Sequence, residues 1–230
     1  MTARKYALVI AAVAAAATAA RAQDAGTAAA APDAGTGAAA QDAGTASGTQ
    51  DGGATGAPQM SAAEQAIMEK YMKAGTPGPE HQRLMKMAGK WKLQVTSWMG
   101  PGAPPMKSEG SAEFTSIFGG RYLEQQVKSD MGGQPFEGKG LEGYDNVTKE
   151  NFGTWVDSMS TSVMVTRGKC PVGAKKCSYK GTMSDAVTGK PAAVTETVTY
   201  TDDDHFTFEL RGPGPGGKTF KMIEIAYTRQ

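Results

Sequence analysis

The chain has 230 residues, of which 30 are glycine and 40% are hydrophobic, so it can form one folded domain with much chain outside the core. Basic and acidic residues almost balance, and the formal net charge is +1. Such a balance removes the electrostatic argument for binding nucleic acid or an anionic membrane surface.

Residues 1–22 have the pattern of a signal peptide. Arg4 and Lys5 give a positive start, an apolar stretch follows, and Ala20-Arg21-Ala22 supplies the small residues that signal peptidase recognises. The apolar stretch is too short and too rich in alanine for a good membrane span, and an uncleaved anchor is the weaker alternative. We therefore predict an exported protein, periplasmic or extracellular, with no transmembrane segment after cleavage.

Residues 23–59 form a low-complexity linker. Four tandem nonapeptides place Asp24, Asp33, Asp42 and Asp51 at a period of nine. The repeats contain no Leu, Ile or Phe, so they cannot bury enough apolar surface to offset the chain entropy lost on folding. We predict a disordered tether. A calcium-binding nonapeptide roll is disfavoured, because such rolls need paired glycines and a large apolar residue.

Residues 60–78 are predicted to be a short helix and its connector. Ser61 and Glu64 fit a capping box, and Gly75 and Pro77 end the helix. One helical face carries a stripe of apolar side chains, namely Ile67, Met68, Tyr71 and Met72. We expect this stripe to pack on the chain's own folded domain, and a partner-binding helix is the alternative.

Residues 79–230 form the folded domain. A second short helix begins at Pro79 and ends before Gly89, after which Trp91, Leu93 and Val95 alternate with polar residues. Glycine-, proline- and aspartate-rich turns then recur between apolar runs, which lie at 114–118, 121–127, 152–156, 163–166, 194–200, 206–210 and 220–227. About ten strands with short connections exclude parallel crossovers. The fold class predicted is all-β, an antiparallel up-and-down barrel.

The start of the first strand resembles a known signature. Gly89-Lys90-Trp91, at the junction of helix and strand, is similar to the Gly-x-Trp motif of the lipocalin and calycin barrels. The resemblance implies that Trp91 closes the barrel floor and that Arg229, near the chain's end, stacks on it as a cation–π contact.

The domain as a whole resembles the exported bacterial domain-of-unknown-function family fifteen-seventy-nine. The similar stretches are 81–91, 101–106, 119–123, 134–138, 143–146, 154–160 and 222–229. This resemblance implies a calycin-like barrel, and it implies no reaction because the family has no established activity.

Cys170 and Cys177 flank a turn-rich hexapeptide. Export permits a disulfide, which would clamp the end of a hairpin. Redox motifs favour Cys-x-x-Cys, and two cysteines do not make a zinc site. We predict a structural disulfide.

The sequence indicates no catalytic residue, no metal site and no cofactor. His81 and His205 lie far apart in the sequence, and the three aspartates before His205 suit a solvated hairpin tip. No serine sits in a nucleophile elbow, and the glycine-rich segments lead into strands rather than helices. A haem held by one histidine is disfavoured because neither histidine falls inside a clear strand.

Polar residues on the strands remain as candidates for ligand binding. They are Arg121, Tyr144, Trp155, Asp157 and Ser158. Trp155 and Asp157 share one face of a strand. If that face is the interior, Asp157 needs a partner such as Arg121, and the two could orient a ligand. A turn-capping aspartate or a structural ion pair is the alternative.

Three functions remain open. The leading hypothesis is binding of a small apolar or amphipathic ligand inside the barrel. The second is a structural or interaction module whose interior is filled by side chains, with no protein partner identified. The third is an enzyme that uses Asp157 and Tyr144. Fold analogy alone does not choose among them.

Overall fold

The computed structural model describes residues 60–214 and 218–230. The predicted signal peptide (1–22) and nonapeptide linker (23–59) lie outside these residues. Nearly all of the described chain belongs to one compact unit, Ala62–Gln230. No helix in this described part is long and apolar enough to cross a membrane.

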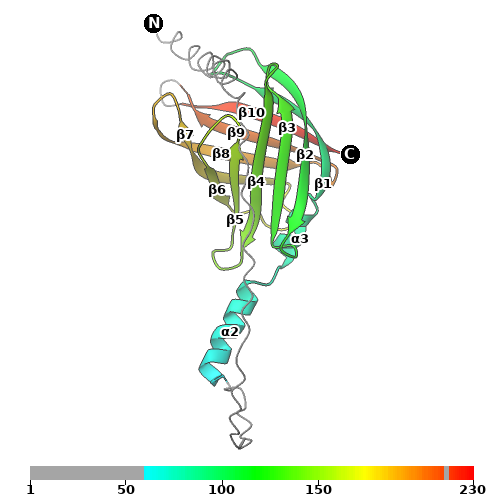
Figure 1. Cartoon of the computed structure of the whole chain (residues 1–230), viewed down its shortest axis with the longest axis vertical. Coiled ribbons are helices and arrows are strands. Elements are labelled where there is room, and N and C mark those ends of the chain that lie inside the picture. The colour runs from blue at the N-terminus through cyan, green and yellow to red at the C-terminus, as the bar shows by residue number, and fades with distance from the viewer. Residues whose placement is uncertain (1–59, 215–217) are drawn as a thin grey trace, which may run out of the picture. The chain divides into compact units, whose positions relative to one another are not determined.

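Ten antiparallel strands of the described chain close into a barrel (Figure 1). The strands are β1 (Gly89–Ser97), β2 (Met106–Ile117), β3 (Tyr122–Asp130), β4 (Pro135–Asp145), β5 (Glu150–Asp157), β6 (Met164–Gly168), β7 (Lys176–Asp185), β8 (Lys190–Tyr200), β9 (His205–Pro213) and β10 (Thr219–Arg229). Each strand pairs with the next one along the chain, and β10 pairs with β1, so no sheet edge remains. The predicted up-and-down barrel is confirmed.

Helix α3 (Pro79–Met85) covers one end of the barrel, which we call the floor. Pro79 suits the first turn, where a backbone N–H has no helical acceptor, and the helix buries His81 and Leu84. Immediately after it, the Met87 carbonyl accepts a hydrogen bond of 2.9 Å from Trp91 Nε1. The helix is thereby tied to the first strand.

Four aromatic side chains, Trp91, Phe114, Phe206 and Tyr227, form the floor cluster. Phe206 and Tyr227 stack with ring centres 4.1 Å apart, and Trp91 meets Phe206 edge-on at 4.9 Å. On the outer side, the Arg229 guanidinium carbon lies 4.3 Å from the centre of the Trp91 ring. Arg229 also donates to the carbonyls of Lys86 and Ala88, at 2.7 and 2.9 Å. One arginine therefore joins the last strand to the segment after α3.

The disulfide between Cys170 and Cys177 spans the turn from β6 to β7, with Cα atoms 5.2 Å apart. Both cysteines are buried and pack with Tyr179. The Cys170 amide also donates to Asn151 Oδ1 at 3.2 Å, which anchors this turn to β5.

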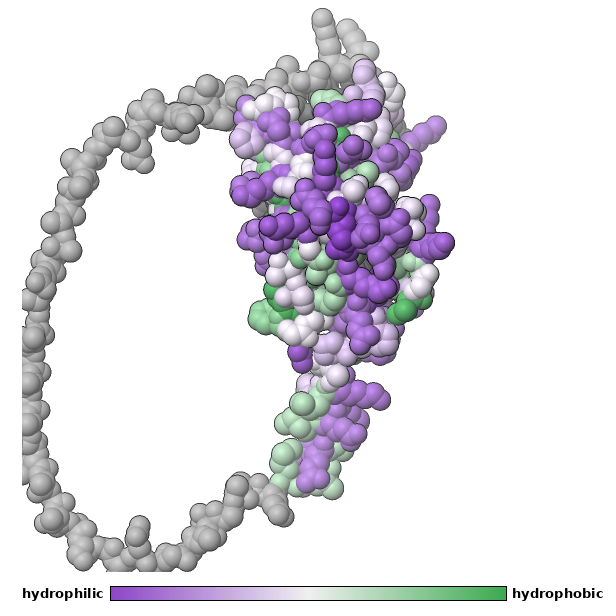
Figure 2. Space-filling view, turned by 90° about the vertical axis from the view of Figure 1, so that its right-hand side faces the viewer, coloured by the Kyte–Doolittle hydropathy of each residue, from purple (hydrophilic) through white to green (hydrophobic). Residues whose placement is uncertain are grey.

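Helix α2 (Ala62–Ala74) precedes α3, and none of its residues is buried. Ile67 is 55% exposed and Tyr71 73%, so the expectation that the apolar stripe packs on the barrel is wrong. The physical reason is that the barrel turns its apolar side chains inward and α3 already covers the floor. Figure 2 shows α2 with an apolar side and a polar side, below a largely hydrophilic barrel face. The Asn146 amide holds the end of α2 by donating to the carbonyls of Ala74 and Thr76.

Candidate functional site in the barrel interior

Strand pairing determines which side chains point into the barrel. Residues directly opposite each other on neighbouring strands lie on the same face of the sheet. Glu142 on β4 is opposite Leu123, which is fully buried, and Glu196 on β8 is opposite buried Leu210. Both glutamates therefore point into the barrel, where a purely structural core would hold apolar side chains.

These glutamates belong to an interior polar cluster, whose members are Arg83, Gln125, Glu142, Thr166, Tyr179, Glu196, Tyr200 and Tyr227. Thr166 Oγ1 donates to Glu196 Oε2 at 2.8 Å. Gln125 Nε2 donates to the Tyr227 hydroxyl at 3.0 Å, beside the floor cluster. The Arg83 guanidinium enters from α3, and its carbon lies 5.3 Å from the centre of the Tyr200 ring.

Burial changes the acid–base behaviour of both carboxyls. Desolvation and the charge of Glu196 raise the pKa of Glu142 to about 7, and the Arg83 charge opposes the rise. Burial also raises the pKa of Glu196, and the hydrogen bond from Thr166 opposes it. Burial therefore favours the protonated form of both interior carboxyl groups, and ionisation of one opposes ionisation of the other.

Three buried donors in the described chain have no hydrogen-bond partner. They are Nε and Nη2 of Arg83 and Nδ2 of Asn151. Asn151 is only 3% exposed and lies on the inner face of β5, two residues before Gly153, which is opposite Glu142. A buried donor without a partner costs about 1–3 kcal/mol, and nearly all such groups in native proteins are satisfied. The interior therefore has unused hydrogen-bonding capacity.

Glycines on the inner wall leave room for these groups. At Gly138 a Cβ atom would collide with the Trp155 ring, so only glycine lets Trp155 lie across β4. At Gly153 the nearest atom to a Cβ would be Thr166 Oγ1, at 3.2 Å. Glu142 and Glu196 lie deep inside the barrel and still keep an intermediate exposed fraction. Part of each glutamate side chain is therefore accessible to solvent.

The predicted candidates at the far end of the barrel from α3 have structural partners. Trp155 Nε1 donates to Asp157 Oδ2 at 3.0 Å, and the Met159 amide donates to Asp157 Oδ1 at 2.9 Å. Ser158 Oγ accepts a hydrogen bond from the Glu137 amide at 3.1 Å. Asp157 thus caps the turn after β5, which was the structural alternative considered for it.

Arg121 and Tyr144 lie at the opposite end, near the floor. Arg121 Nη1 donates to the Phe118 carbonyl at 2.9 Å, and the Tyr144 ring meets His81 edge-on at 5.6 Å. Arg121 adjoins the Tyr122–Gly143 pair, whereas Asp157 is opposite Gly138. Asp157 is therefore about 20 Å along the sheet from Arg121 and Tyr144, at about 3.3 Å per residue. The hypothesised Arg121–Asp157 pair does not form.

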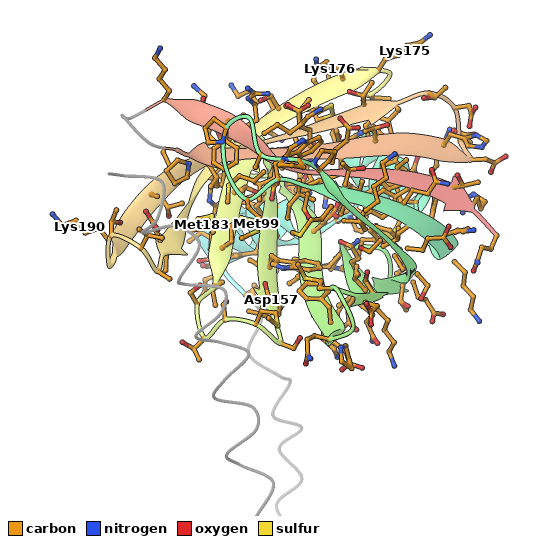
Figure 3. The ribbon with its side chains drawn as sticks, turned by 90° about the horizontal axis from the view of Figure 1, so that it is seen from above. Met99, Asp157, Lys175, Lys176, Met183 and Lys190 are labelled. Atoms are coloured by element: carbon orange, nitrogen blue, oxygen red, sulfur yellow. A yellow bond between two sulfur atoms is a disulfide. The ribbon has the colours of Figure 1, made fainter. Side chains whose placement is uncertain are left out.

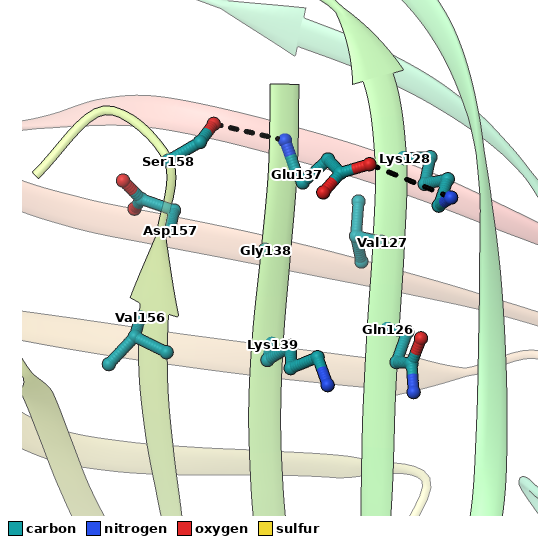
Figure 4. A pocket seen from close by; sticks show the side chains of 9 residues that line it. All are labelled: Gln126, Val127, Lys128, Glu137, Gly138, Lys139, Val156, Asp157 and Ser158. Atoms are coloured by element: carbon teal, nitrogen blue, oxygen red, sulfur yellow. Dashed lines mark hydrogen bonds and ion pairs between the residues drawn. The ribbon is translucent and has the colours of Figure 1, made fainter. Parts of the chain in front are cut away.

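Asp157 and Ser158 border a shallow groove on the outer wall of β3, β4 and β5, with a volume of about 280 Å³ (Figure 4). Outward-pointing polar side chains line it, among them Lys128 and Glu137, which form an ion pair at 3.6 Å. Seen from above, Asp157 lies on the other side of the barrel from Lys175 and Lys176 (Figure 3). The groove is open and lacks the buried groups of the interior.

The residues of the described chain contain no cluster of three or more His, Cys, Asp or Glu side chains that could hold a metal ion. His205 Nδ1 lies 2.9 Å from Asp202 Oδ1 at an exposed hairpin tip. The interior glutamates are only two, so the polar cluster does not resemble a metal centre.

Sequence reasoning missed the interior polar cluster, although one signal was present. Val194, Glu196 and Val198 fall on one face of β8, so a charge stands where alternation leads one to expect an apolar residue. Arg83 carried no comparable signal, because a short helix does not reveal from its sequence which side chain enters a barrel.

A family model described as a protein of unknown function, DUF1579, matches residues 76–229, which is more than half of the chain. The chain belongs to this family. The match covers α3 and the whole barrel, so Arg83, Glu142 and Glu196 all lie within the DUF1579 region.

Among solved structures, the crystal structure of Rv2717c from M. tuberculosis is similar with a TM-score of 0.52 and 16% identity, covering 67% of this chain and 99% of that one. The structure of EF1p2_mFAP2b bound to DFHBI is similar with a TM-score of 0.35 and 12% identity, covering 65% of this chain and 98% of that one. The likeness to Rv2717c shows the fold alone. No curated protein matches this chain in sequence.

Proposed function

We propose that this DUF1579 protein is exported and binds a small amphipathic molecule inside its barrel. The observation that carries the proposal is a set of three buried donor atoms without partners, Nε and Nη2 of Arg83 and Nδ2 of Asn151, in an interior that also holds two carboxyl groups. Buried polar groups are costly unless another group satisfies them. A bound molecule with polar atoms would supply the missing partners, and the floor cluster would contact its apolar part.

The aromatic floor cluster and the polar side chains around Glu142 divide the interior into two parts. The floor cluster is closely packed, which suits an end that is closed by α3. Barrels of this size can leave space for one small ligand. A ligand would therefore lie between the floor cluster and the far end, against β4, β5 and β8.

Export is the second half of the proposal. The disulfide between Cys170 and Cys177 is compatible with an oxidising compartment. The signal-peptide pattern of residues 1–22 points in the same direction.

An interaction module is the second candidate, and the exposed stripe of α2 favours it. Ile67, Met68, Tyr71 and Met72 are each at least 50% exposed, which is unusual for an apolar set on one helical face. An enzyme that uses Asp157 and Tyr144 together has no support, because the register separates them by about 20 Å.

The test is native mass spectrometry of the exported protein, purified from a bacterial periplasm, before and after organic extraction. We expect an added mass of a few hundred daltons that extraction removes. Gly153→Leu should abolish the added mass, because the new side chain would project into the space opposite Glu142. Thr154→Leu, which changes the outward-facing neighbour, is the control and should keep it. A bare mass in the unmodified protein would favour the interaction module.

A further inference from the structure

Resting on the proposed interior binding, we infer that the bound molecule is a small organic cation, held by Glu142 and Glu196 in exchange for a proton. Three features of the interior indicate this class of ligand: the charges that face it, the way they are paired, and the rings around them.

The charges inside the described barrel do not balance when both carboxyls ionise. Two glutamates face one guanidinium, that of Arg83, which leaves a single negative charge uncompensated. The other charged groups, at the ends of the barrel, have partners outside the interior polar cluster. Arg229 pairs with Asp204 at 2.9 Å, and Asp157 accepts from Trp155. A proton or a bound cation is needed to neutralise the remaining charge.

Arg83 does not neutralise the glutamates by direct contact. In the described chain no ion pair within 4.0 Å joins Arg83, Lys or His to Glu142 or Glu196. The guanidinium instead lies over the Tyr200 ring and interacts with the Tyr179 and Tyr200 hydroxyls, while its Nε and Nη2 have no hydrogen-bond partner. The carboxyl groups thus remain available to a ligand, because the one hydrogen bond that a described side chain makes to either of them is that of the Thr166 hydroxyl to Glu196.

The surroundings suit an organic ammonium rather than a bare metal ion. Aromatic rings, whose faces attract cations, line the interior, and the inward-facing ones include Trp155, Tyr179, Tyr200 and Phe208. The buried Asn151 amide, on the same inner face of β5, offers a donor to an oxygen of the same molecule. The ligand class is therefore an amine with an apolar body and a hydroxyl or carbonyl oxygen.

The exchange predicts a pH dependence. The titratable and charged groups that face Glu142 are Glu196 from β8, Arg83 from α3, Tyr179 from β7, Tyr200 from β8 and Tyr227 from β10. The tyrosines stay neutral because burial raises the pKa of each hydroxyl. With the pKa of Glu142 at about 7, the proton competes with a cation below that pH. Affinity for a cation should then rise about tenfold from pH 6 to pH 8.

The experiment compares three probes of equal chain length, hexylammonium, hexanoate and hexanol, by calorimetry on the extracted full-length protein. We expect hexylammonium to bind most tightly, and more tightly at pH 8 than at pH 6. Glu142→Gln and Glu196→Gln should each weaken hexylammonium about 10- to 100-fold and flatten the pH dependence. Glu137→Gln, on the outer wall of β4, is the matched control and should change neither.

Other outcomes separate this inference from the proposed function. Tighter binding of hexanoate, or of hexanol with no effect of either glutamate variant, would overturn the cation inference and leave interior binding intact. Binding of none of the three probes at either pH would contradict both. If a glutamine variant unfolds, the pH profile of the unmodified protein decides, because a flat profile contradicts proton exchange.

Discussion

At the scale of single residues, Glu142 governs the chemistry of the interior. Strand alternation forces its carboxyl inward, and burial with a second carboxyl nearby favours the protonated form. The unfolded chain would ionise it at its ordinary pKa of 4.5. The folded protein therefore binds a proton in a pH range where the unfolded chain has lost it.

This difference predicts that the ligand-free protein is less stable at pH 8 than at pH 5. The contribution of Glu142 to the free energy of unfolding is fully present below pH 4.5 and is lost as pH rises through 7. It amounts to roughly 3 kcal/mol for a pKa shift from 4.5 to about 7. Glu142→Gln should reduce the slope and leave the part that comes from Glu196, whose pKa burial also raises. Urea unfolding across this range measures the slope. Glu137→Gln should keep the slope.

Two surface aspartates act in the opposite sense, so the urea series should stay above pH 4.5. The pKa of Asp145 is lowered by a hydrogen bond from the Val147 amide, and that of Asp202 by one from His205. Their contribution is lost as pH falls, below the window of Glu142. Stability of the unmodified protein that rises from pH 5 to pH 8 would contradict the assignment of a buried, protonated Glu142.

At the scale of elements, the β6–β7 turn is held by the disulfide and by Asn151. β6 has only five residues and pairs with β7 over three positions, so it is the least paired strand in the described barrel. The Cys170–Cys177 bond closes a short loop at its end, and the Cys170 amide contacts Asn151. The turn therefore fixes Asn151 next to the interior polar cluster.

Replacing both cysteines by serine should destabilise the protein by about 2–3 kcal/mol, the value expected for a loop of this length. Urea unfolding of the double variant, compared with the unmodified protein under reducing and oxidising conditions, measures this. An unmodified protein whose stability does not change on reduction would show that the bond contributes nothing to the fold.

The elements also show what the sequence could predict. Period-two alternation and regular turns identified the barrel, because both follow from local backbone rules. Helix α2 was identified from its capping residues and stripe, but its lack of packing depends on a floor already covered by α3. Arg121 and Asp157 could not be placed, because pairing register sets their separation and one sequence does not give it. Glu142 and Arg83 come into the same interior only when the barrel closes.

At the scale of the whole molecule, the barrel combines a closed aromatic end with a polar interior. Closure of β1 on β10 removes every free edge of the sheet. Gly138 and Gly153 place no side chain on the inner wall. The same closure brings Glu142, Glu196 and Arg83 from distant parts of the chain into one space. Such an interior is poorly explained as a core, because its polar groups lack partners.

The most direct test of interior binding is an electron-density map of the exported protein, purified from a bacterial periplasm without organic extraction. The account predicts density for a non-protein molecule between the floor cluster and the far end of the barrel, within hydrogen-bonding distance of Glu142 or Glu196. An interior filled only by side chains, with Arg83 turned to pair with Glu142 and Asn151 satisfied by a protein acceptor, would contradict it.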